Sequence, residues 1–435
     1  MSSDTIFALA TGAGRAAIAV IRLSGPCVSQ MLEAIAGLTP QPRFAHYAGL
    51  RDPRSGEILD HGLVLFFPAG RSPTGEDYGE LQIHGGRSVI DGFLTSLSQT
   101  PGLRRAEPGE FARRSFVRGK MDLSQVEGIA DLVDAETALQ RRQALQALSG
   151  GLRRRVEEWR DALIRASALV EAELDFSDEG DVLAPAEHLR PLLAPLMREM
   201  EELARQAPAA ERLREGFLVL LLGPPNSGKS TLLNALAQRD VAIVSDIPGT
   251  TRDMIEVHLD IGGLPVTLVD TAGLRETADE IERLGVSRTR ARIGEADLSL
   301  WLSEGGKEPP ADEIAAGAGD CIRIATKADV RVPVGADLAI SARTGLGMEA
   351  LIADIRRRAE QRLGDGSGAL LTRERHRILV EAAAACLRAS LEQGKALEIV
   401  AEDLRGATRA LGRIVGAVDV EDVLDAIFAQ FCIGK

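Results

Sequence analysis

The sequence predicts a multidomain protein with an N-terminal α+β domain, a helical region and an α/β domain. Three observations predict this organisation. Short apolar runs separated by turn residues occupy the first 118 positions, and apolar residues then recur at helical spacing to about position 214. From position 216, continuous apolar runs alternate with helical stretches, which is typical of a sheet covered on both faces. A chain of 435 residues is long enough for about three such domains.

Composition narrows the classes of function. The formal net charge is −13, so a protein-wide basic field for nucleic acid is absent and any RNA contact must use a local patch. Aromatic residues make up only 3% of the chain, which argues against a base-stacking platform. The N-terminus lacks a basic signal-peptide region, and the most apolar run, 217–222, is too short to span a bilayer.

Cysteine usage indicates a reduced compartment. The four cysteines are far apart and form no C-x-x-C pair, so they predict neither a disulfide framework nor a zinc site. They are Cys27, Cys321, Cys386 and Cys432. We therefore expect a cytoplasmic protein that does not enter the membrane.

The N-terminal domain is predicted to be α+β over residues 1–118. Runs such as 17–21 and 63–67 are rich in β-branched and aromatic residues, and Gly and Pro follow them.

Helical spacing then takes over. Six apolar residues between positions 145 and 163 are three or four apart, which places them on one helix face, and Gly150-Gly151 is expected to interrupt that stretch. Similar spacing returns after the Gly-rich loop 364–368. The simplest interpretation is a discontinuous helical domain, 119–214 and 369–435, into which an α/β domain, 215–368, is inserted. Domain termini often lie close together, so such an insertion is physically easy.

A phosphate-binding loop is predicted at 223–230. Its sequence Gly-Pro-Pro-Asn-Ser-Gly-Lys-Ser fits G-x-x-x-x-G-K-S/T, and it follows a predicted strand and precedes a predicted helix. Backbone N–H groups at the helix N-terminus would face the phosphates. Lys229 offers a positive charge to the β- and γ-phosphates, and the Ser230 hydroxyl suits Mg²⁺.

Three further motifs follow in the order of a Ras-like GTPase domain: Asp270-Thr271-Ala272-Gly273, Thr326-Lys327-Ala328-Asp329 and Ser341-Ala342-Arg343. The first can hold Mg²⁺ through water and can sense the γ-phosphate through the N–H of its glycine. Asp329 carries an acceptor-only carboxylate that can pair with N1–H and the exocyclic amine of guanine. The third motif fits the loop that backs the base. Each is weak alone, but with the phosphate loop they are highly specific.

The machinery for hydrolysis is less defined by the residues. Gly249-Thr250-Thr251-Arg252-Asp253 occupies the first switch position, where Thr251 can complete the Mg²⁺ shell. GTPases often place a water-orienting Gln after D-x-x-G, but Leu274 stands there. Carboxylates at 276, 279, 280 and 282 are open alternatives, and Arg252 and Arg275 are candidate arginine fingers.

Over essentially its whole length the sequence resembles the bacterial tRNA-modification GTPase family MnmE (TrmE). The resemblance is carried by the motifs above, by Asp4-Thr5-Ile6, Gly14-Arg15, Ile21-Arg22-Leu23-Ser24-Gly25, Glu80-Leu81-Gln82, His84-Gly85-Gly86 and Gly109-Glu110-Phe111, and by the terminal Phe431-Cys432-Ile433-Gly434-Lys435. The resemblance implies an N-terminal folate-binding-like domain that dimerises, and a GTPase that works on tRNA.

The resemblance also implies a set of cofactors and their contacts. The N-terminal domain would bind a one-carbon tetrahydrofolate derivative (5-formyl- or 5,10-methylene-tetrahydrofolate) through Arg22, Glu80, Lys120 and Lys435. The GTPase domain would bind Mg²⁺ through Ser230 and Thr251, and K⁺, in place of an arginine finger, through Asn226, Ser245, Ile247 and Thr250. Glu282 matches the carboxylate that orients the attacking water, which decides among the four carboxylates.

The complete set of expected GTP contacts comes from these motifs and their neighbours. It comprises Asn226, Ser227, Gly228, Lys229, Ser230, Thr231, Ser245, Asp246, Ile247, Pro248, Gly249, Thr250, Thr251, Asp270, Thr271, Ala272, Gly273, Thr326, Lys327, Ala328, Asp329, Ser341, Ala342 and Arg343.

The family further implies partners and a reaction. A flavoprotein, MnmG (GidA), would join a homodimer of this chain in a heterotetramer that adds a carboxymethylaminomethyl or aminomethyl group at C5 of the wobble uridine. Cys432 lies in the matching tail, where it is at least as easily a small apolar residue as a nucleophile. The alternatives are a GTP-switched RNA or ribosome assembly factor without base chemistry, and a nucleotide-binding structural protein; a GTPase domain alone does not separate them.

The sequence departs from the family pattern in two places. The guanine motif begins with Thr326, where the family has the Asn that tethers the base loop to the phosphate loop, so a lower guanine affinity is expected. The stretch 304–320 is short and rich in Gly, Pro and Ala, so that end of the GTPase domain is expected to be trimmed or mobile.

Overall fold

The computed structural model describes most of the chain, including every β-strand and helix named below. The described residues are 4–12, 14–175, 185–239, 242–243, 255–270, 296–308, 320–364, 370–418, 421–429, 431 and 434. They form two compact units, residues 1–130 with 411–435 and residues 131–410. Within the described ranges, every helix is too short or too polar to cross a lipid bilayer.

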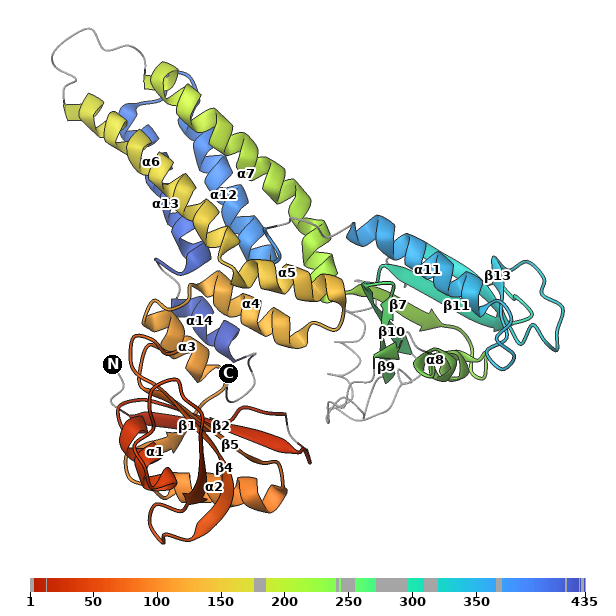
Figure 1. Ribbon diagram of the computed structural model, residues 1–435. Helices are drawn as coiled ribbons and strands as arrows, with labels where there is room; N and C mark the ends of the chain where they lie inside the picture. Colours follow the sequence, from red (N-terminus) through yellow and green to blue (C-terminus); the bar gives the residue numbers. More distant parts are fainter. Residues whose placement is uncertain are drawn as a thin grey trace, which may run out of the picture. The chain divides into compact units, whose positions relative to one another are not determined.

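The first unit is built on a six-stranded sheet with strand order β3-β4-β5-β2-β1-β6, drawn in red and orange in Figure 1. All neighbouring strands are antiparallel except β1 and β6. The strands are β1 (Thr5–Leu9), β2 (Ile18–Ser24), β3 (His46–Arg51), β4 (Ile58–Phe67), β5 (Tyr78–His84) and β6 (Leu103–Arg105). The expected strands at 17–21 and 63–67 correspond to β2 and to the end of β4.

Both faces of this sheet are covered, because alternate residues of a strand point to opposite faces. Phe7 belongs to the core formed with α1 (Val28–Ala36) and α2 (Arg87–Ser98). Its neighbours Ile6 and Ala8 pack on the other face, with Phe111 of α3 (Glu110–Val117).

The end of the chain belongs to this same unit. Leu424, Ile427 and Phe428 of α14 (Glu421–Phe428) pack with α3 and with α4 (Leu123–Asp134). Gly434 lies so close to β1 that a side chain there would meet the Leu9 carbonyl oxygen at 2.4 Å. The C-terminal segment is therefore tied to the N-terminal sheet.

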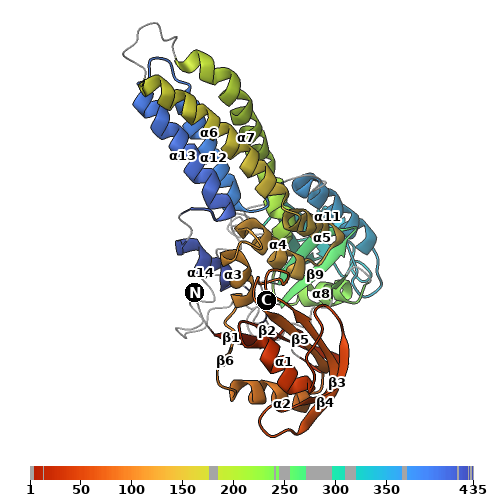
Figure 2. The same cartoon turned by 60° about the vertical axis from the view of Figure 1, so that its left-hand side comes forward.

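The helical part of the second unit comprises α5 (Ala138–Leu148), α6 (Gly151–Asp175), α7 (Pro185–Glu215), α12 (Glu374–Ser390) and α13 (Leu397–Val415). The last four run side by side in Figures 1 and 2. Val156, Trp159 and Leu163 of α6 are fully buried, as their spacing predicts. The break between α5 and α6 falls at Gly150, whose φ is 74°, which confirms the predicted interruption.

The α/β part of the second unit is a seven-stranded sheet with order β13-β12-β11-β7-β10-β9-β8. Its strands are β7 (Phe217–Leu222), β8 (Ala242–Ile243), β9 (Ile255–Ile261), β10 (Leu264–Asp270), β11 (Leu298–Glu304), β12 (Asp320–Thr326) and β13 (Leu338–Ala339). The five central and outer strands β10, β7, β11, β12 and β13 run parallel. The apolar run 217–222 is β7, and the alternation of apolar runs with helical stretches after position 216 is confirmed.

Helices α8 (Lys229–Ala237) and α11 (Met348–Leu363) complete the core of this sheet. Leu232 and Leu236 of α8, with Leu351 and Ile355 of α11, are fully buried against the strands. The loops that carry the predicted motifs follow the carboxyl ends of these parallel strands, where open α/β sheets usually bind their ligands.

Candidate nucleotide-binding site

The phosphate loop connects β7 to α8, as its motif predicts. Gly223 has φ 136°, and a Cβ there would stand 2.2 Å from the Leu302 carbonyl oxygen, so this position requires glycine. Gly228 is the N-cap of α8 with φ 100°, and Asn226 is also left-handed with φ 62°. The N-terminus of α8 therefore opens into the loop, where free N–H groups and the helix dipole favour a phosphate.

Two side chains at the start of α8 are held in place by neighbouring loops. The Lys229 ammonium donates to the carbonyl oxygens of Gly223 at 2.8 Å and Pro224 at 3.1 Å, which keeps its charge over the loop. The Ser230 hydroxyl donates to Oδ2 of Asp270 at 3.1 Å. A hydroxyl and a carboxylate are hard oxygen donors of the kind Mg²⁺ prefers, so these residues fit the predicted metal.

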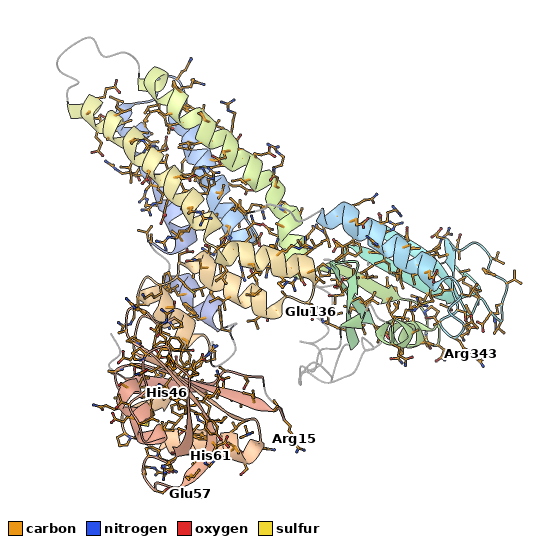
Figure 3. The ribbon with its side chains drawn as sticks, viewed as in Figure 1. Arg15, His46, Glu57, His61, Glu136 and Arg343 are labelled. Atoms are coloured by element: carbon orange, nitrogen blue, oxygen red, sulfur yellow. The ribbon has the colours of Figure 1, made fainter. Side chains whose placement is uncertain are left out.

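A cavity of about 280 Å³ lies beside the phosphate loop. It is lined by Gly228, Thr231, Leu232, Thr326, Lys327, Asp329, Val330, Ile340, Ser341, Ala342 and Arg343. Apolar walls with one exposed carboxylate, Asp329, suit a flat heterocycle that presents N–H donors. The structure thus brings together the phosphate loop and the two motifs predicted to recognise the base. Arg343, labelled in Figure 3, lies at the surface of this part.

Backbone hydrogen bonds lock the two base-recognition motifs to each other. The Ala328 N–H donates to the Ile340 carbonyl oxygen at 3.1 Å, and the Ser341 N–H donates to Leu346 at 2.9 Å. The buried Ser341 hydroxyl accepts the Thr344 N–H at 3.2 Å. These contacts make the cavity wall one connected piece.

Lys327 has a partner that the motifs did not predict. It is left-handed, with φ 58°, and its ammonium pairs with the carboxylate of Glu304 at the end of β11. The signal was present in the sequence, because β11 and β12 are parallel and Glu304 is in register with Thr326, one residue before the lysine. The apolar cavity residues Leu232 and Val330 were also missed; each lies within a few residues of a motif.

Several predicted residues lie outside the described part of the chain, so their roles stay predictions. They are Ser245, Asp246, Ile247, Pro248, Gly249, Thr250, Thr251, Thr271, Ala272, Gly273, Glu282, Cys432 and Lys435. Most of the stretch 304–320 is also outside it. Of the residues predicted to hold K⁺, only Asn226 is described, and it is exposed on the phosphate loop.

Three of the four predicted folate residues, Arg22, Glu80 and Lys120, lie in the described part of the first unit. Arg22 and Glu80 are in register on β2 and β5, with Arg22 Nε 3.2 Å from Glu80 Oε1. The Tyr78 hydroxyl donates to the same oxygen at 3.0 Å, and Arg22 also donates to the Gly434 carbonyl oxygen at 3.2 Å. The Lys120 ammonium donates to the Gly70 carbonyl oxygen at 2.6 Å and lines a cavity of about 730 Å³.

That larger cavity contains a cluster of ion pairs centred on Arg114, which is only 9% exposed. Its guanidinium binds Glu76 at 2.8 Å, Asp4 at 3.0 Å and Glu110 at 3.0 Å. Burial raises the pKa of Glu110, but hydrogen bonds, the largest from Arg104, outweigh burial and hold that pKa below its ordinary value. The sequence did not predict this ion-pair cluster. The spacing of four residues between Glu110 and Arg114 on one helix was the signal that could have indicated their pairing.

The fold and the loops at the edge of its parallel sheet define a P-loop nucleotide-binding protein of the Ras-like GTPase type. The protein-family model described as GTP-binding protein TrmE N-terminus matches residues 5–120, and the family model of the MnmE helical domain matches residues 123–432. The chain belongs to the MnmE (TrmE) family, as its sequence predicts.

Curated relatives agree with this assignment over the full length. A protein of Azorhizobium caulinodans is 52% identical over 441 residues, covering 100% of this chain and 99% of the relative. A protein of Methylobacterium radiotolerans is 51% identical over 448 residues, covering 100% of this chain and 99% of the relative. Both bear the name tRNA modification GTPase MnmE. Among solved structures, the G domain of the T. maritima FeoB iron transporter is 23% identical, covering 33% of this chain and 98% of that one, with a TM-score of 0.25.

Proposed function

We propose that this chain is a GTP-hydrolysing enzyme that takes part in tRNA modification. The observation that carries the proposal is the meeting of the phosphate loop, the Asp329 motif and the Ser341 motif around one cavity, in a chain about half identical to proteins named tRNA modification GTPase along its whole length. The site supports binding of a purine nucleotide triphosphate, and the relatives' name supports the tRNA role.

The phosphate side of the site supports a stepwise account of hydrolysis. Lys229, held over the loop, would neutralise charge on the β- and γ-phosphates; Ser230 and Thr251 would hold Mg²⁺, and Asp270 would hold it through water. A bound Mg²⁺ would supply positive charge to stabilise the charge that develops on the phosphates. Glu282 orients the attacking water, because Leu274 has no polar group for that role.

A bound K⁺ would supply the charge that other GTPases take from an arginine. Asn226 stands exposed on the phosphate loop, with its amide oxygen available as a hard ligand, and Ser245, Ile247 and Thr250 would add further oxygens. K⁺ bound there contributes electrostatic stabilisation of the transferred phosphoryl group.

The first unit is proposed to bind a tetrahydrofolate derivative as the one-carbon donor. Glu80 is a half-buried carboxylate oriented by Arg22 and Tyr78, which fits the N–H donors of a pterin. Arg22 also reaches Gly434, one residue from the terminal Lys435 of the predicted set. The Arg22–Glu80 pair carries this proposal.

We also propose that two copies of the chain pair through the first unit and act with the flavoprotein MnmG (GidA) on the wobble uridine of tRNA in the cytoplasm. The edge strand β3 supports pairing: Tyr47 is 71% exposed on it, and Phe44, just before it, is 63% exposed. An exposed edge strand with large apolar side chains is a template for another chain. His46 and His61, labelled in Figure 3, lie on β3 and its neighbour β4.

Nucleoside mass spectrometry of tRNA tests the proposal. A strain that lacks the gene should lose the C5 modification of wobble uridine, and the wild-type chain should restore it. Lys229→Ala should not restore it, because the phosphates lose their cation. Unchanged wobble uridines in the deletion strain would refute the modification role and favour an RNA or ribosome assembly factor.

A further inference from the structure

Thr326 connects the base cavity to the phosphate loop. It is the last residue of β12, and its hydroxyl donates to the carbonyl oxygen of Ser227 at 2.7 Å. Thr326 is 5% exposed and Ser227 is 2% exposed, so water does not compete for this bond. The two partners are 99 positions apart in the chain.

Packing reinforces the hydrogen bond. A Cβ built at Gly228 would stand 3.7 Å from both Cβ and Cγ2 of Thr326, so the threonine methyl group lies beside the glycine of the phosphate loop. The two partners of Thr326, Ser227 and Gly228, immediately precede Lys229. Any displacement of Thr326 would therefore be transmitted to the loop that holds the phosphates.

The same residue fixes the base side. Lys327, Ala328 and Asp329 follow Thr326 directly, and the Ala328 N–H is bonded to Ile340 in the opposite wall of the cavity. The side chain of Thr326 holds the start of this loop, and the Ala328 N–H holds its middle. The carboxylate of Asp329 is thus placed relative to the phosphate loop by a short chain of contacts that begins at one hydroxyl.

We infer that Thr326 is a positioning residue for guanine-nucleotide binding, whose hydroxyl holds the base-recognition loop against the phosphate loop. This inference rests on the proposed guanine-nucleotide function. Threonine stands where the family has the tethering asparagine, and a lower guanine affinity was expected from the sequence for that reason. The threonine hydroxyl supplies a tether of its own.

Substitutions at this position separate the hydroxyl from the methyl group. Thr326→Val keeps the volume but removes the donor and leaves the Ser227 carbonyl buried without that partner, which should weaken nucleotide binding about tenfold to a hundredfold. Thr326→Ser keeps the donor and should stay within about threefold of wild type. Thr267→Val is the matched control: Thr267 is 8% exposed in β10 of the same sheet, and its hydroxyl lies 3.4 Å from His258, away from the cavity.

The measurement is the dissociation constant of a fluorescent N-methylanthraniloyl-GDP for the full-length chain, with GDP and XDP as competitors. Thr326→Val should weaken binding of GDP and XDP by the same factor, because Asp329 still chooses the base. Thr326→Ser and Thr267→Val should bind as wild type does. A role limited to general folding predicts instead that Thr267→Val loses as much affinity as Thr326→Val.

Each other outcome has a definite meaning. Equal affinity of wild type and Thr326→Val would overturn the inference and leave the proposed GTPase function standing. Serine as weak as valine would show that the hydroxyl is not the tether, which also overturns it. A wild-type chain that binds no GDP at millimolar concentration would instead remove the proposed function itself.

Discussion

Replacing Arg114 by methionine should destabilise the first unit by about 3–5 kcal/mol, because the buried cluster loses its central cation and keeps three carboxylates for only two arginines, Arg104 and Arg118. The guanidinium of Arg114 binds Glu76, Asp4 and Glu110 within 3.0 Å, and it also donates to the Ser24 carbonyl oxygen at 3.3 Å. Glu76 is itself only 7% exposed, so water cannot replace the arginine freely. Methionine retains much of the buried aliphatic volume, and the loss therefore reports on charge rather than on a cavity.

The neighbouring residue Arg113 provides a matched control. Its side chain is 48% exposed and pairs with Asp425 at 3.3 Å. An exposed pair of this kind contributes about 0–1 kcal/mol, so Arg113→Met should change the stability of the first unit little. The two variants differ by one position on one helix and by the burial of the removed charge.

Hydrogen exchange by mass spectrometry measures the effect in the full-length chain. Under conditions where closing outpaces exchange, a loss of 3–5 kcal/mol lowers the protection of peptides covering β5 by about two to nearly four orders of magnitude. Trp159 and Trp301, the only two tryptophans of the sequence, belong to the second unit. Their fluorescence should therefore report the same unfolding transition of the second unit as in wild type. If β5 protection in Arg114→Met falls by less than tenfold, or no more than in Arg113→Met, the reasoning about the buried cluster is wrong.

Three further outcomes follow. Hydrogen bonds, chiefly from Arg104, outweigh burial and keep the pKa of Glu110 low in the folded state. Ionised Glu110 therefore stabilises the folded state above its unfolded pKa of about 4.3, and this stabilisation is lost as pH falls through the folded pKa. Hydrogen exchange of the first unit should show lower stability at pH 3 than at pH 6, and Glu110→Gln should reduce that difference in stability. Gly223→Ala should lose nucleotide binding in titration calorimetry at unchanged thermal stability of the first unit, since its Cβ would meet the Leu302 carbonyl oxygen; retained affinity would contradict the close approach. Phosphate release should be faster in K⁺ than in Na⁺, and Glu282→Ala should bind GTP but nearly abolish hydrolysis; equal rates in both salts, or a normal rate in the variant, would remove the respective role.

Strong local patterns made the α/β part predictable. The apolar run 217–222 is a strand at those bounds, and the phosphate loop lies between it and a helix as the motif requires. A P-loop depends on backbone conformation and a few residue types at fixed spacing, so one sequence contains most of the information. The position of Gly150 between two helices was readable for the same reason.

Long-range contacts were harder to predict. Nothing in the local sequence around Thr326 shows that its hydroxyl meets Ser227, because that contact depends on strand order and on a close approach of the two loops. One long-range contact does follow once the strand register is known, because Glu304 is in register with Thr326 and so lies near Lys327.

Competition binding with GTP, ATP and XTP tests the central claim most directly, on the full-length chain and on Asp329→Asn. The account predicts that the wild-type chain binds GTP, that ATP and XTP compete poorly, and that the variant loses GTP but gains XTP. The reason is that an amide can both accept from N1–H and donate to the 2-oxo group of xanthine, whereas a carboxylate only accepts. A wild-type chain that binds no guanine nucleotide at millimolar concentration, or that binds ATP as well as GTP, would contradict it.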